Sequence, residues 1–285
     1  MFSFFSYIFY FCSNRLRLIG AQAFYSFYIT LNAFFQIFIL LSMPFFLNRN
    51  SKIADFSVLK TDMHSHILPG IDDGSPNVET SIQLIKELQD IGYSSFIATP
   101  HIYKELYPNN IDTINTALQQ LKAAIQKAGL QVQITAAAEY MVDESFEKEL
   151  ESDDLLLFAG NKILVEMSAL SPSSNLYECF FKLQLKGITP VIAHPERYHF
   201  LSGTRHVFHE WMDRGYDLQV NILSLAGFYG NQVKELANYL LKENLVHYLG
   251  TDAHNIQQVQ ALKSSLKTKE IQKILSDYTF YNDVI

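Results

Sequence analysis

The stretch Thr61–Ser75 reads TDMHSHILPGIDDGS and places His64 and His66 one residue apart, directly after an apolar, β-rich run. Two adjacent aspartates, Asp72 and Asp73, follow in the next turn signal. Alternate side chains of a strand share a face, so both imidazoles are able to reach one ion. A lone His-x-His pair is weak evidence, because packing selects alternate positions too, and Asp-Asp-Gly alone is typical of a turn. The interpretation therefore depends on what else reaches the same place.

From residue 56 onward, short β-rich runs alternate with amphipathic segments of helical periodicity. The expected strands are Val58–Met63, Ser95–Thr99, Val132–Ala138, Lys162–Glu166, Thr189–Ala193, Leu218–Asn221 and Val246–Gly250. The expected helices are Pro76–Ile91, Asp112–Ala128, Asp143–Glu151, Asn175–Lys186, Gly203–Arg214, Gly230–Glu243 and Gln257–Ser276. This alternation, without a long polar linker or an internal repeat, predicts an α/β fold, either a parallel barrel or a doubly wound sheet.

Residues able to bind a metal follow the carboxyl ends of nearly all these strands. They are His64, His66, His101, Glu139, Glu166, His194, Asp252 and His254, with Asp73 in the first loop. The sixth strand ends instead in Asn221, a weak ligand. Because chemistry in parallel barrels collects at the carboxyl ends of the strands, this placement favours the barrel. Each residue alone has a structural explanation, such as a turn, a helix cap or a solvated strand end. Their joint placement is what indicates a site.

The donor set indicates which ions would bind. Five histidines and four carboxylates without a thiolate favour borderline to hard divalent ions such as manganese, iron or zinc. Nine ligands are too many for one ion and suffice for two or three that share carboxylates. Three divalent ions would outweigh the four carboxylates, and the resulting positive site suits an anionic substrate such as a phosphate ester. The other histidines, His199, His206, His209 and His247, lack this placement and are expected to be surface or packing residues.

Composition and missing motifs exclude several other classes. The formal net charge of −7 and the absence of a Lys/Arg run argue against nucleic acid as a partner. Cys12 and Cys179 lie far apart and lack C-x-x-C spacing, so neither a thiolate zinc site nor a disulfide framework is indicated, and a reducing compartment fits best. Neither cysteine is followed six residues later by arginine, so the thiolate-loop phosphatase mechanism is absent. Motifs that cradle nucleotides are also missing.

Residues 1–50 form a hydrophobic N-terminal extension that differs from the expected catalytic domain at 51–285. The run Ile29–Leu47 is long enough to cross a hydrocarbon core and lacks a small-residue cleavage pattern, which favours an anchor over a removable signal peptide. The alternative interpretation is that Met43 is the true start and residues 1–42 are an over-extended reading frame. The sequence leaves both interpretations open.

Six motifs resemble those of the polymerase-and-histidinol-phosphatase (PHP) superfamily. They are DMHSHILPGIDDGS at 62–75, ATPHIY at 98–103, AAEY at 137–140, LVEMS at 164–168, IAHPERY at 192–198 and GTDAH at 250–254. Within the superfamily, the sequence is most similar to the manganese-dependent protein-tyrosine phosphatases of bacterial capsule and exopolysaccharide systems. The resemblance covers residues 56–285 and implies a distorted seven-stranded (β/α) TIM-like barrel, the PHP fold, with three divalent ions at the carboxyl ends of the strands.

The resemblance also implies how the ligands are shared. One ion would take His64, His66, Glu139 and Asp252, the second would take His101 and Glu166 and share Glu139, and the third would take Asp73, His194 and His254. Asp73 matches the family ligand, whereas Asp72 is expected to shape the turn. No ligand position is missing, so the resemblance implies a catalytic member of the family.

The implied activity is hydrolysis of phosphotyrosine by a metal-activated hydroxide, with Mn²⁺ as the expected cofactor and iron or zinc as alternatives. His194 would act at the catalytic centre, and Arg197 would hold the phosphoryl group through a bidentate fork. The alternative for Arg197 is a salt bridge with Glu196. Tyr103 and Tyr198 are candidates to flank the substrate ring.

The implied partner is the tyrosine-rich C-terminal tail of a bacterial autokinase that controls polysaccharide export. Such a tail is cytoplasmic, so we expect a cytoplasmic enzyme, or one held at the cytoplasmic face of the inner membrane if residues 1–50 are a real anchor. A homo-oligomer remains open. Two other functions also remain open: a small-molecule phosphatase acting on histidinol phosphate or a nucleotide, and a membrane-tethered module that binds the tail without hydrolysing it.

Overall fold

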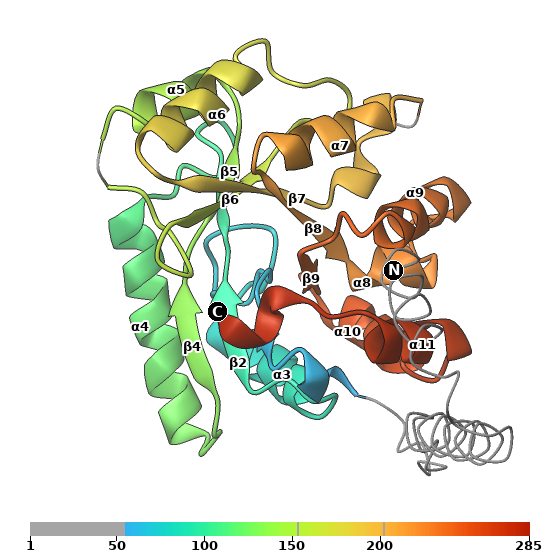
Figure 1. The fold of residues 1–285 in the computed structure, drawn as a ribbon. Helices are drawn as coiled ribbons and strands as arrows, with labels where there is room; N and C mark the ends of the chain where they lie inside the picture. The colour runs from blue at the N-terminus through green and yellow to red at the C-terminus, as the bar shows by residue number, and fades with distance from the viewer. Residues whose placement is uncertain (1–54, 153, 202) are drawn as a thin grey trace, which may run out of the picture. The chain divides into compact units, whose positions relative to one another are not determined.

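The computed structural model describes residues 55–152, 154–201 and 203–285, shown in colour in Figure 1. The hydrophobic extension, the candidate anchor Ile29–Leu47, the alternative start Met43 and the boundary at residue 50 lie outside these residues. Among the described helices, none is both long enough and apolar enough to cross a membrane.

The strands form two sheets in which every pairing is parallel. The smaller sheet has the order β1 (Thr61–Asp62), β2 (Ser95–Ala98), β4 (Gln133–Ala136). The larger sheet has the order β3 (His101–Ile102), β5 (Glu139–Met141), β6 (Lys162–Glu166), β7 (Thr189–Ala193), β8 (Asp217–Asn221), β9 (Tyr248–Gly250). Strands β3 and β5 continue β2 and β4 after short breaks. The chain therefore lays down seven strand segments side by side in sequence order.

Backbone hydrogen bonds join the last strand segment to the first. The amide of Asp252 donates to the carbonyl of His64 at 2.8 Å, and the amide of His66 donates to the carbonyl of Ala253 at 3.0 Å. These bonds lie just beyond β9 and β1, at the carboxyl ends of both strands. They confirm the predicted seven-segment (β/α) barrel, distorted by the breaks after β2 and β4.

A buried amide from the C-terminus joins the same two strands nearer their start. Asn282 lies in the short 3₁₀ helix η5 (Tyr281–Val284) and is wholly buried. Its side-chain nitrogen donates to the carbonyl oxygens of Thr61 and Leu249 at 3.0 and 2.7 Å. Its oxygen accepts the amide of Leu249 at 3.0 Å. The C-terminal segment thus satisfies backbone groups that β1 and β9 do not pair directly.

Helices cover the outside of the barrel (Figure 1). They are α3 (Val78–Gln89), α4 (Ile111–Lys127), α5 (Glu144–Glu149), α6 (Leu176–Leu185), α7 (His206–Asp213), α8 (Ile222–Ala226), α9 (Asn231–Lys242), α10 (Ile256–Ser265) and α11 (Lys269–Asp277). Side-chain caps begin several of them, for example Asn77 before α3 and Asn110, which forms a capping box, before α4.

Two local predictions differ from the structure, and one helix was not predicted. The predicted helix Gln257–Ser276 is two helices, because Thr268 accepts a hydrogen bond from Ile271 N and begins α11 as its N-cap. The predicted strand Val58–Met63 opens instead with the 3₁₀ helix η2 (Phe56–Val58). Helix α8 was not predicted, since five residues between a strand end and a left-handed Gly227 are too few for a periodic signal.

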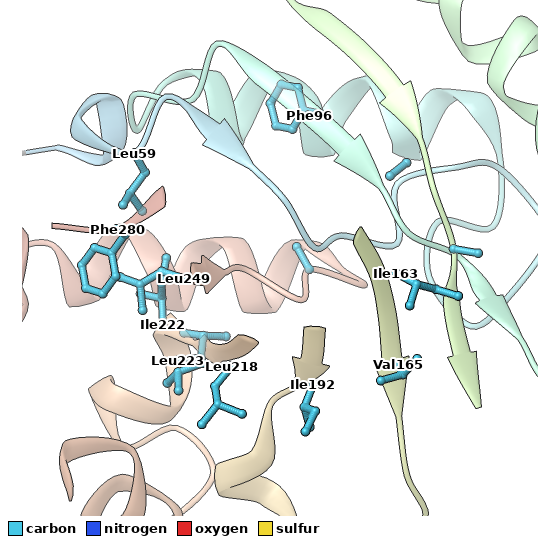
Figure 2. Packing of buried hydrophobic residues seen from close by; sticks show 14 of the residues in the cluster. Leu59, Phe96, Ile163, Val165, Ile192, Leu218, Ile222, Leu223, Leu249 and Phe280 are labelled. Atoms are coloured by element: carbon cyan, nitrogen blue, oxygen red, sulfur yellow. The ribbon is translucent and has the colours of Figure 1, made fainter. Parts of the chain in front are cut away.

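The apolar core has two parts that follow the alternation of each strand. Leu164 and Val191 belong to a small cluster together with residues of β2 and β9. The alternate positions Ile163, Val165 and Ile192 belong to the larger cluster beneath the helices, part of which Figure 2 shows. Each such side chain stabilises the fold by about 1.5–3 kcal/mol when fully buried. Apolar packing thus fixes the strands whose carboxyl ends carry the polar residues.

Candidate metal centre

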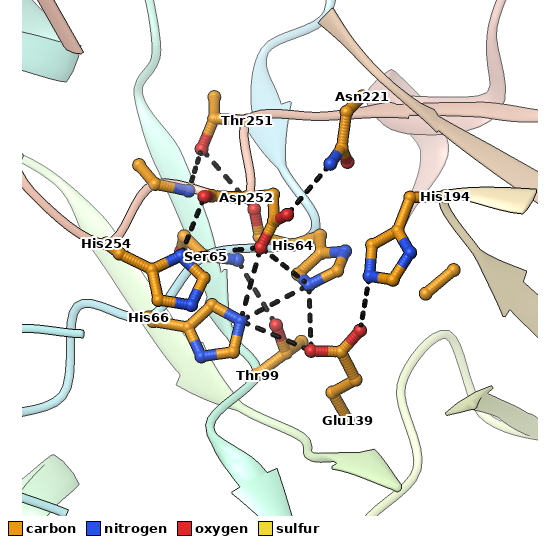
Figure 3. A network of polar contacts seen from close by, with 12 residues as sticks. His64, Ser65, His66, Thr99, Glu139, His194, Asn221, Thr251, Asp252 and His254 are labelled. Atoms are coloured by element: carbon orange, nitrogen blue, oxygen red, sulfur yellow. Dashed lines mark hydrogen bonds and ion pairs between the residues drawn. The ribbon is translucent and has the colours of Figure 1, made fainter. Parts of the chain in front are cut away.

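Four side-chain atoms converge at the carboxyl end of the barrel (Figure 3). The Nε2 atoms of His64 and His66 lie 3.3 Å apart, and each lies 3.2–3.3 Å from Glu139 Oε2 and 3.4 Å from Asp252 Oδ1. Ligands at 2.0–2.2 Å from a tetrahedral ion are about 3.3–3.6 Å apart, close to these spacings. All four residues are buried. We refer to these four residues as the cradle.

Neighbouring side chains direct the imidazoles of the cradle. His66 Nδ1 lies 2.8 Å from Asp72 Oδ2, so Nδ1 carries the proton and Nε2 presents its lone pair to the cradle. His64 Nδ1 lies 2.7 Å from Gln219 Oε1, with the same consequence. Asp72 also accepts the amide of Gly74 at 3.0 Å. Asp72 therefore shapes the turn as predicted, and it also orients His66.

A second group of donors shares Glu139 with the cradle. His101 Nδ1 lies 2.8 Å from Glu166 Oε1 and 3.3 Å from Glu139 Oε2. These three residues are close enough to hold one ion together. Glu139 is thus a carboxylate placed between two candidate ion positions, which is how metal clusters are commonly bridged.

The remaining predicted ligands fall into two places. Asp73 Oδ1 lies 3.5 Å from His101 Nε2 and 3.5 Å from His254 Nε2, at the more exposed side of the site. His194 Nε2 lies instead 3.0 Å from Glu139 Oε1. The structure therefore brings all nine predicted residues to one site, but it groups His194 with the Glu139 side and not with Asp73 and His254.

Charge pairing governs the protonation of the site. Although burial disfavours the imidazolium, Glu139 and Asp252 raise the pKa of His64 to about 9. Burial likewise opposes ionisation of Glu139, yet His64 and His101 hold its pKa well below the ordinary value. A hydrogen bond with His254 lowers the pKa of Asp73 to about 2. Glu139 and Asp73 are therefore anionic at neutral pH, as cation binding requires, and an ion that binds His64 must displace a proton from the ring.

Three buried atoms in the site lack a well-formed hydrogen bond within the described part of the chain, namely His101 Nδ1, Glu139 Oε2 and His194 Nδ1. An unsatisfied buried polar group costs about 1–3 kcal/mol, and more if it is charged. A divalent ion in the cradle would satisfy Glu139 Oε2. The geometry, the burial and the N/O donor set together fit a borderline to hard divalent ion.

The backbone is also unusual at two of these residues. His194 and Asp252 have φ angles of 34° and 51°, in the left-handed region that residues other than glycine rarely adopt. Such conformations cost of order 1–3 kcal/mol and persist where the surroundings impose them, often at functional sites. The strain falls at the carboxyl ends of β7 and β9, where the chain turns each side chain into the site.

Arg197 is anchored to the cradle. Its Nη1 donates to Asp252 Oδ2 at 2.7 Å, and its guanidinium lies 4.7 Å from the centroid of the Tyr229 ring. Glu196 is not its partner: this buried carboxylate accepts hydrogen bonds from Asn221 N at 3.0 Å and Ser224 Oγ at 2.7 Å. The Arg197–Glu196 salt bridge considered as an alternative is therefore wrong.

One tyrosine near the site, Tyr198, differs from the prediction, whereas Tyr103 stays a prediction. Tyr198 is buried, and its hydroxyl donates to Ala193 O at 2.9 Å and accepts Met167 N at 3.0 Å, so it is not free to flank a substrate ring. Tyr107 was not predicted. Its ring stacks on His101 with centroids 5.4 Å apart. With sixteen tyrosines in the chain, no sequence signal distinguishes Tyr107 from the rest.

Comparisons with known proteins agree with this site. A family profile described as "Capsular polysaccharide synthesis, CpsB/CapC" matches residues 60–278. The tyrosine-protein phosphatase YwqE of Bacillus subtilis is 32% identical over 197 residues, which cover 69% of this chain and 78% of YwqE. The tyrosine-protein phosphatase CpsB of Streptococcus agalactiae is 29% identical over 201 residues, covering 68% and 83%.

A solved structure is similar over most of the described chain. It is titled "Crystal structures of YwqE from Bacillus subtilis and CpsB from Streptococcus pneumoniae, unique metal-dependent tyrosine phosphatases". The TM-score is 0.67 at 29% identity, and the match covers 76% of this chain and 91% of the other. The family match over residues 60–278 includes all the barrel strands and all nine candidate ligands.

Proposed function

The chain belongs to the CpsB/CapC family of capsular polysaccharide synthesis proteins, and from this premise we propose that it is a metal-dependent tyrosine phosphatase. The observation that carries the proposal is the cradle, in which two imidazoles and two carboxylates converge with the spacing of ligands around one ion. Hydrolysis of a phosphate monoester fits such a site, because the reaction needs an activated water and neutralised phosphoryl oxygens.

We propose that the cradle holds one ion and that His101 and Glu166 hold a second, with Glu139 shared between them. Asp73 and His254 are proposed for a third ion at the more exposed side, where both approach His101. The distances favour placing His194 beside Glu139, facing the first two positions. Manganese is the proposed metal, with iron or zinc as alternatives, since the donors are imidazole and carboxylate alone.

When bound, the divalent ions would supply a water that is nucleophilic at neutral pH and positive charge for the phosphoryl oxygens. Arg197 would bind two phosphoryl oxygens through its planar fork and so align phosphorus for in-line attack. Asp252 holds the guanidinium from one side and Tyr229 from another, which fixes its direction before substrate arrives. The tyrosyl oxygen then leaves; with a pKa of about 10, a phenol departs more readily than an aliphatic hydroxyl.

The proposed substrate is a phosphotyrosine protein, namely the tyrosine-rich tail of a bacterial autokinase that controls capsule or exopolysaccharide export. Membership in a capsular polysaccharide synthesis family supports this partner. Because such a tail is cytoplasmic, the enzyme is proposed to act in the cytoplasm.

A substrate comparison on the full-length protein tests the proposal. Phosphotyrosine peptide and histidinol phosphate are assayed at equal concentrations with Mn²⁺, then with excess EDTA, then with Mn²⁺ restored. We expect preferential peptide turnover that EDTA abolishes and Mn²⁺ restores. Preferential turnover of histidinol phosphate would identify a small-molecule phosphatase instead. Peptide binding without hydrolysis by the metal-loaded protein would identify a binding module.

A further inference from the structure

Strand β8 carries no candidate metal ligand, yet it contributes buried polar side chains to the site. Its residues alternate: Leu218 and Val220 belong to the large apolar cluster, whereas Gln219 and Asn221 point to the other face. Gln219 and Asn221 are wholly buried. Buried amides destabilise a fold unless their hydrogen bonds are satisfied, so the partners of these two residues are informative.

The two amides connect two residues of the cradle. His64 Nδ1 donates to Gln219 Oε1 at 2.7 Å, and Gln219 Nε2 donates to Asn221 Oδ1 at 2.8 Å. Asn221 Nδ2 then donates to Asp252 Oδ2 at 2.8 Å. The series therefore begins at one proposed ligand of an ion and ends at another ligand of the same ion.

The direction of this series follows from Asp252. An ionised carboxylate only accepts hydrogen bonds, so Asn221 must turn its NH₂ group toward Asp252 and its oxygen toward Gln219. Gln219 must then present its NH₂ to Asn221 and its oxygen to His64. His64 is thereby obliged to keep a proton on Nδ1, so Nε2 is the nitrogen that releases its proton when an ion binds. A negative charge at one side of the cradle thus sets the tautomer at the other.

We propose that Gln219 and Asn221 form an amide relay that positions His64 and Asp252 for metal binding. They are positioning residues that act through the two ligands. The inference deepens the proposed function and rests on it, since it presumes that an ion occupies the cradle. It also explains why the strand that carries no ligand has polar residues facing the site.

Further contacts hold the relay in place. Gln219 Oε1 also accepts the amide of His194 at 3.4 Å, which links the relay to the end of β7. The amide of Asn221 donates to the buried carboxylate of Glu196, which in turn accepts the hydroxyl of Ser224. Glu196 therefore fixes the backbone from which Asn221 projects, a role that its position beside Arg197 in the sequence does not suggest.

Replacing Gln219 by glutamate tests whether the direction of the hydrogen bonds matters or only the packing of the side chain, because the two side chains have nearly the same shape. In Q219E the new carboxylate still accepts from His64 but has no hydrogen to donate to Asn221. The Asn221 side-chain oxygen then either faces the carboxylate oxygen of residue 219, or the amide group of Asn221 rotates. Rotation turns the Asn221 oxygen toward the carboxylate of Asp252. Gln219 reaches Asp252 only by way of Asn221, so any effect of Q219E on the position of Asp252 would be transmitted by the side chain of Asn221.

The experiment measures Mn²⁺ binding to chelator-stripped, full-length protein by calorimetric titration, with circular dichroism and thermal unfolding of the metal-free forms as the fold check. The variants are Q219M, Q219E, N221L and the double variant Q219M/N221L. The matched control is N282L, which removes a wholly buried amide that contacts β1 and β9 but none of the cradle residues. It is expected to lower the unfolding temperature without changing Mn²⁺ affinity.

We expect Q219M, Q219E and N221L each to weaken the tightest Mn²⁺ site by about 10–100-fold, as loss of a ligand-orienting partner typically does. The double variant should lose little more than either single one, because both substitutions break the same relay. Wild-type affinity in folded Q219M and N221L would overturn the inference. If the losses of Mn²⁺ binding free energy in the two single variants add in the double variant, Gln219 and Asn221 act independently and the proposed relay is overturned. If the wild-type protein binds Mn²⁺ but does not hydrolyse phosphotyrosine, the proposed function fails, and the relay is still tested by the Mn²⁺ affinities of the variants relative to wild type. If the wild-type protein binds no Mn²⁺, both the proposed function and the relay are refuted.

Discussion

Arg197 Nη1 lies 2.7 Å from Asp252 Oδ2, so a charged hydrogen bond joins the proposed phosphoryl-binding residue to the metal cradle. The Arg197 side chain keeps 37% of its surface exposed, and Asp252 keeps 3%. The guanidinium therefore spans the distance from a buried carboxylate to solvent. Asn221 donates to the same oxygen, Asp252 Oδ2, so this carboxylate oxygen has a second hydrogen-bond donor besides Arg197.

The first prediction concerns the shape of this guanidinium. Arg197→Lys keeps the charge but loses the planar fork and the contact with Tyr229. A hydrogen bond to a charged group contributes about 1.5–3 kcal/mol, so kcat/KM for a phosphotyrosine peptide should fall by about 10–100-fold. Arg205→Lys is the matched control, because Arg205 also stacks on a tyrosine, Tyr239, at 4.5 Å. Equal kinetics for the two variants would exclude the proposed role.

The second prediction separates structure from substrate contact at Tyr198. Its hydroxyl joins the carbonyl of Ala193 to the amide of Met167, and all three groups are buried. Tyr198→Phe should lower the free energy of unfolding by about 1–3 kcal/mol, because both backbone groups lose a partner. KM for the peptide should stay within about twofold of wild type, because the Tyr198 hydroxyl binds two backbone groups and not the substrate. Urea unfolding and steady-state kinetics measure the two quantities. A raised KM with unchanged stability would return Tyr198 to the substrate site.

The third prediction concerns Cys179, the cysteine within the described residues. Burial in α6 raises the pKa of its thiol to about 11, so little thiolate exists at neutral pH. Iodoacetamide at pH 7.5 should therefore leave phosphatase activity intact, with Cys179 unmodified by mass spectrometry. Cys179→Ser should also remain active when folded. Inactivation that follows alkylation of Cys179 would indicate thiolate chemistry instead of metal chemistry.

The fourth prediction is a pH dependence of stability at His247, near the start of β9. Burial, with Lys162 nearby, lowers the pKa of His247 although Asp217 opposes the shift. Its Nδ1 accepts the amide of Leu218 at 3.2 Å, which requires the neutral ring. The unfolded chain binds the proton more readily, so this contribution is complete above pH 6.5 and is lost as the pH falls below it.

His247→Asn keeps an acceptor for the Leu218 amide and removes the titration. Urea unfolding of the metal-free protein at pH 7.5, 6.5 and 5.5 should therefore show a smaller decrease for this variant than for wild type. The comparison uses the difference between the two proteins, because other groups titrate equally in both. Parallel curves would mean that His247 keeps the same pKa in the folded and unfolded states.

The candidate ligands were predictable because nearly all of them lie at or just after the carboxyl end of a β-rich run that is visible in the sequence. Glu166 ends a β-rich run, and His101 and Asp252 come just after two others; a parallel barrel brings the carboxyl ends of all its strands to one end. The order of the strands was predictable for the same reason, since successive β/α units lie side by side. Neither inference needs the position of a single side chain.

The contacts behind the ligands could not be predicted in this way. Gln219 and His64 are 155 residues apart, and their contact depends on which rotamers fit inside the closed barrel. Nothing in the local sequence distinguishes the buried Tyr198 from Tyr107, which stacks on His101. Each tyrosine follows a candidate histidine ligand, His194 or His101, by a few residues. The grouping of His194 with Glu139 likewise depends on a left-handed backbone that the packed site imposes.

The last prediction concerns Gly250, where the end of β9 passes close to the relay. A Cβ atom at this residue would lie 2.6 Å from Gln219 Nε2 and 2.8 Å from His64 Cβ, both far inside van der Waals contact. The backbone of β1 holds His64, so Gly250→Ala should displace Gln219 and weaken the tightest Mn²⁺ site by about tenfold or more. Gly203→Ala is the control, because a Cβ there meets nothing within 4 Å. Mn²⁺ titration of both metal-free variants measures the difference. Unchanged Mn²⁺ affinity in Gly250→Ala would mean that β9 is able to retreat from β1 while the cradle keeps its shape, and the close packing of these two strands would then have no part in positioning the metal.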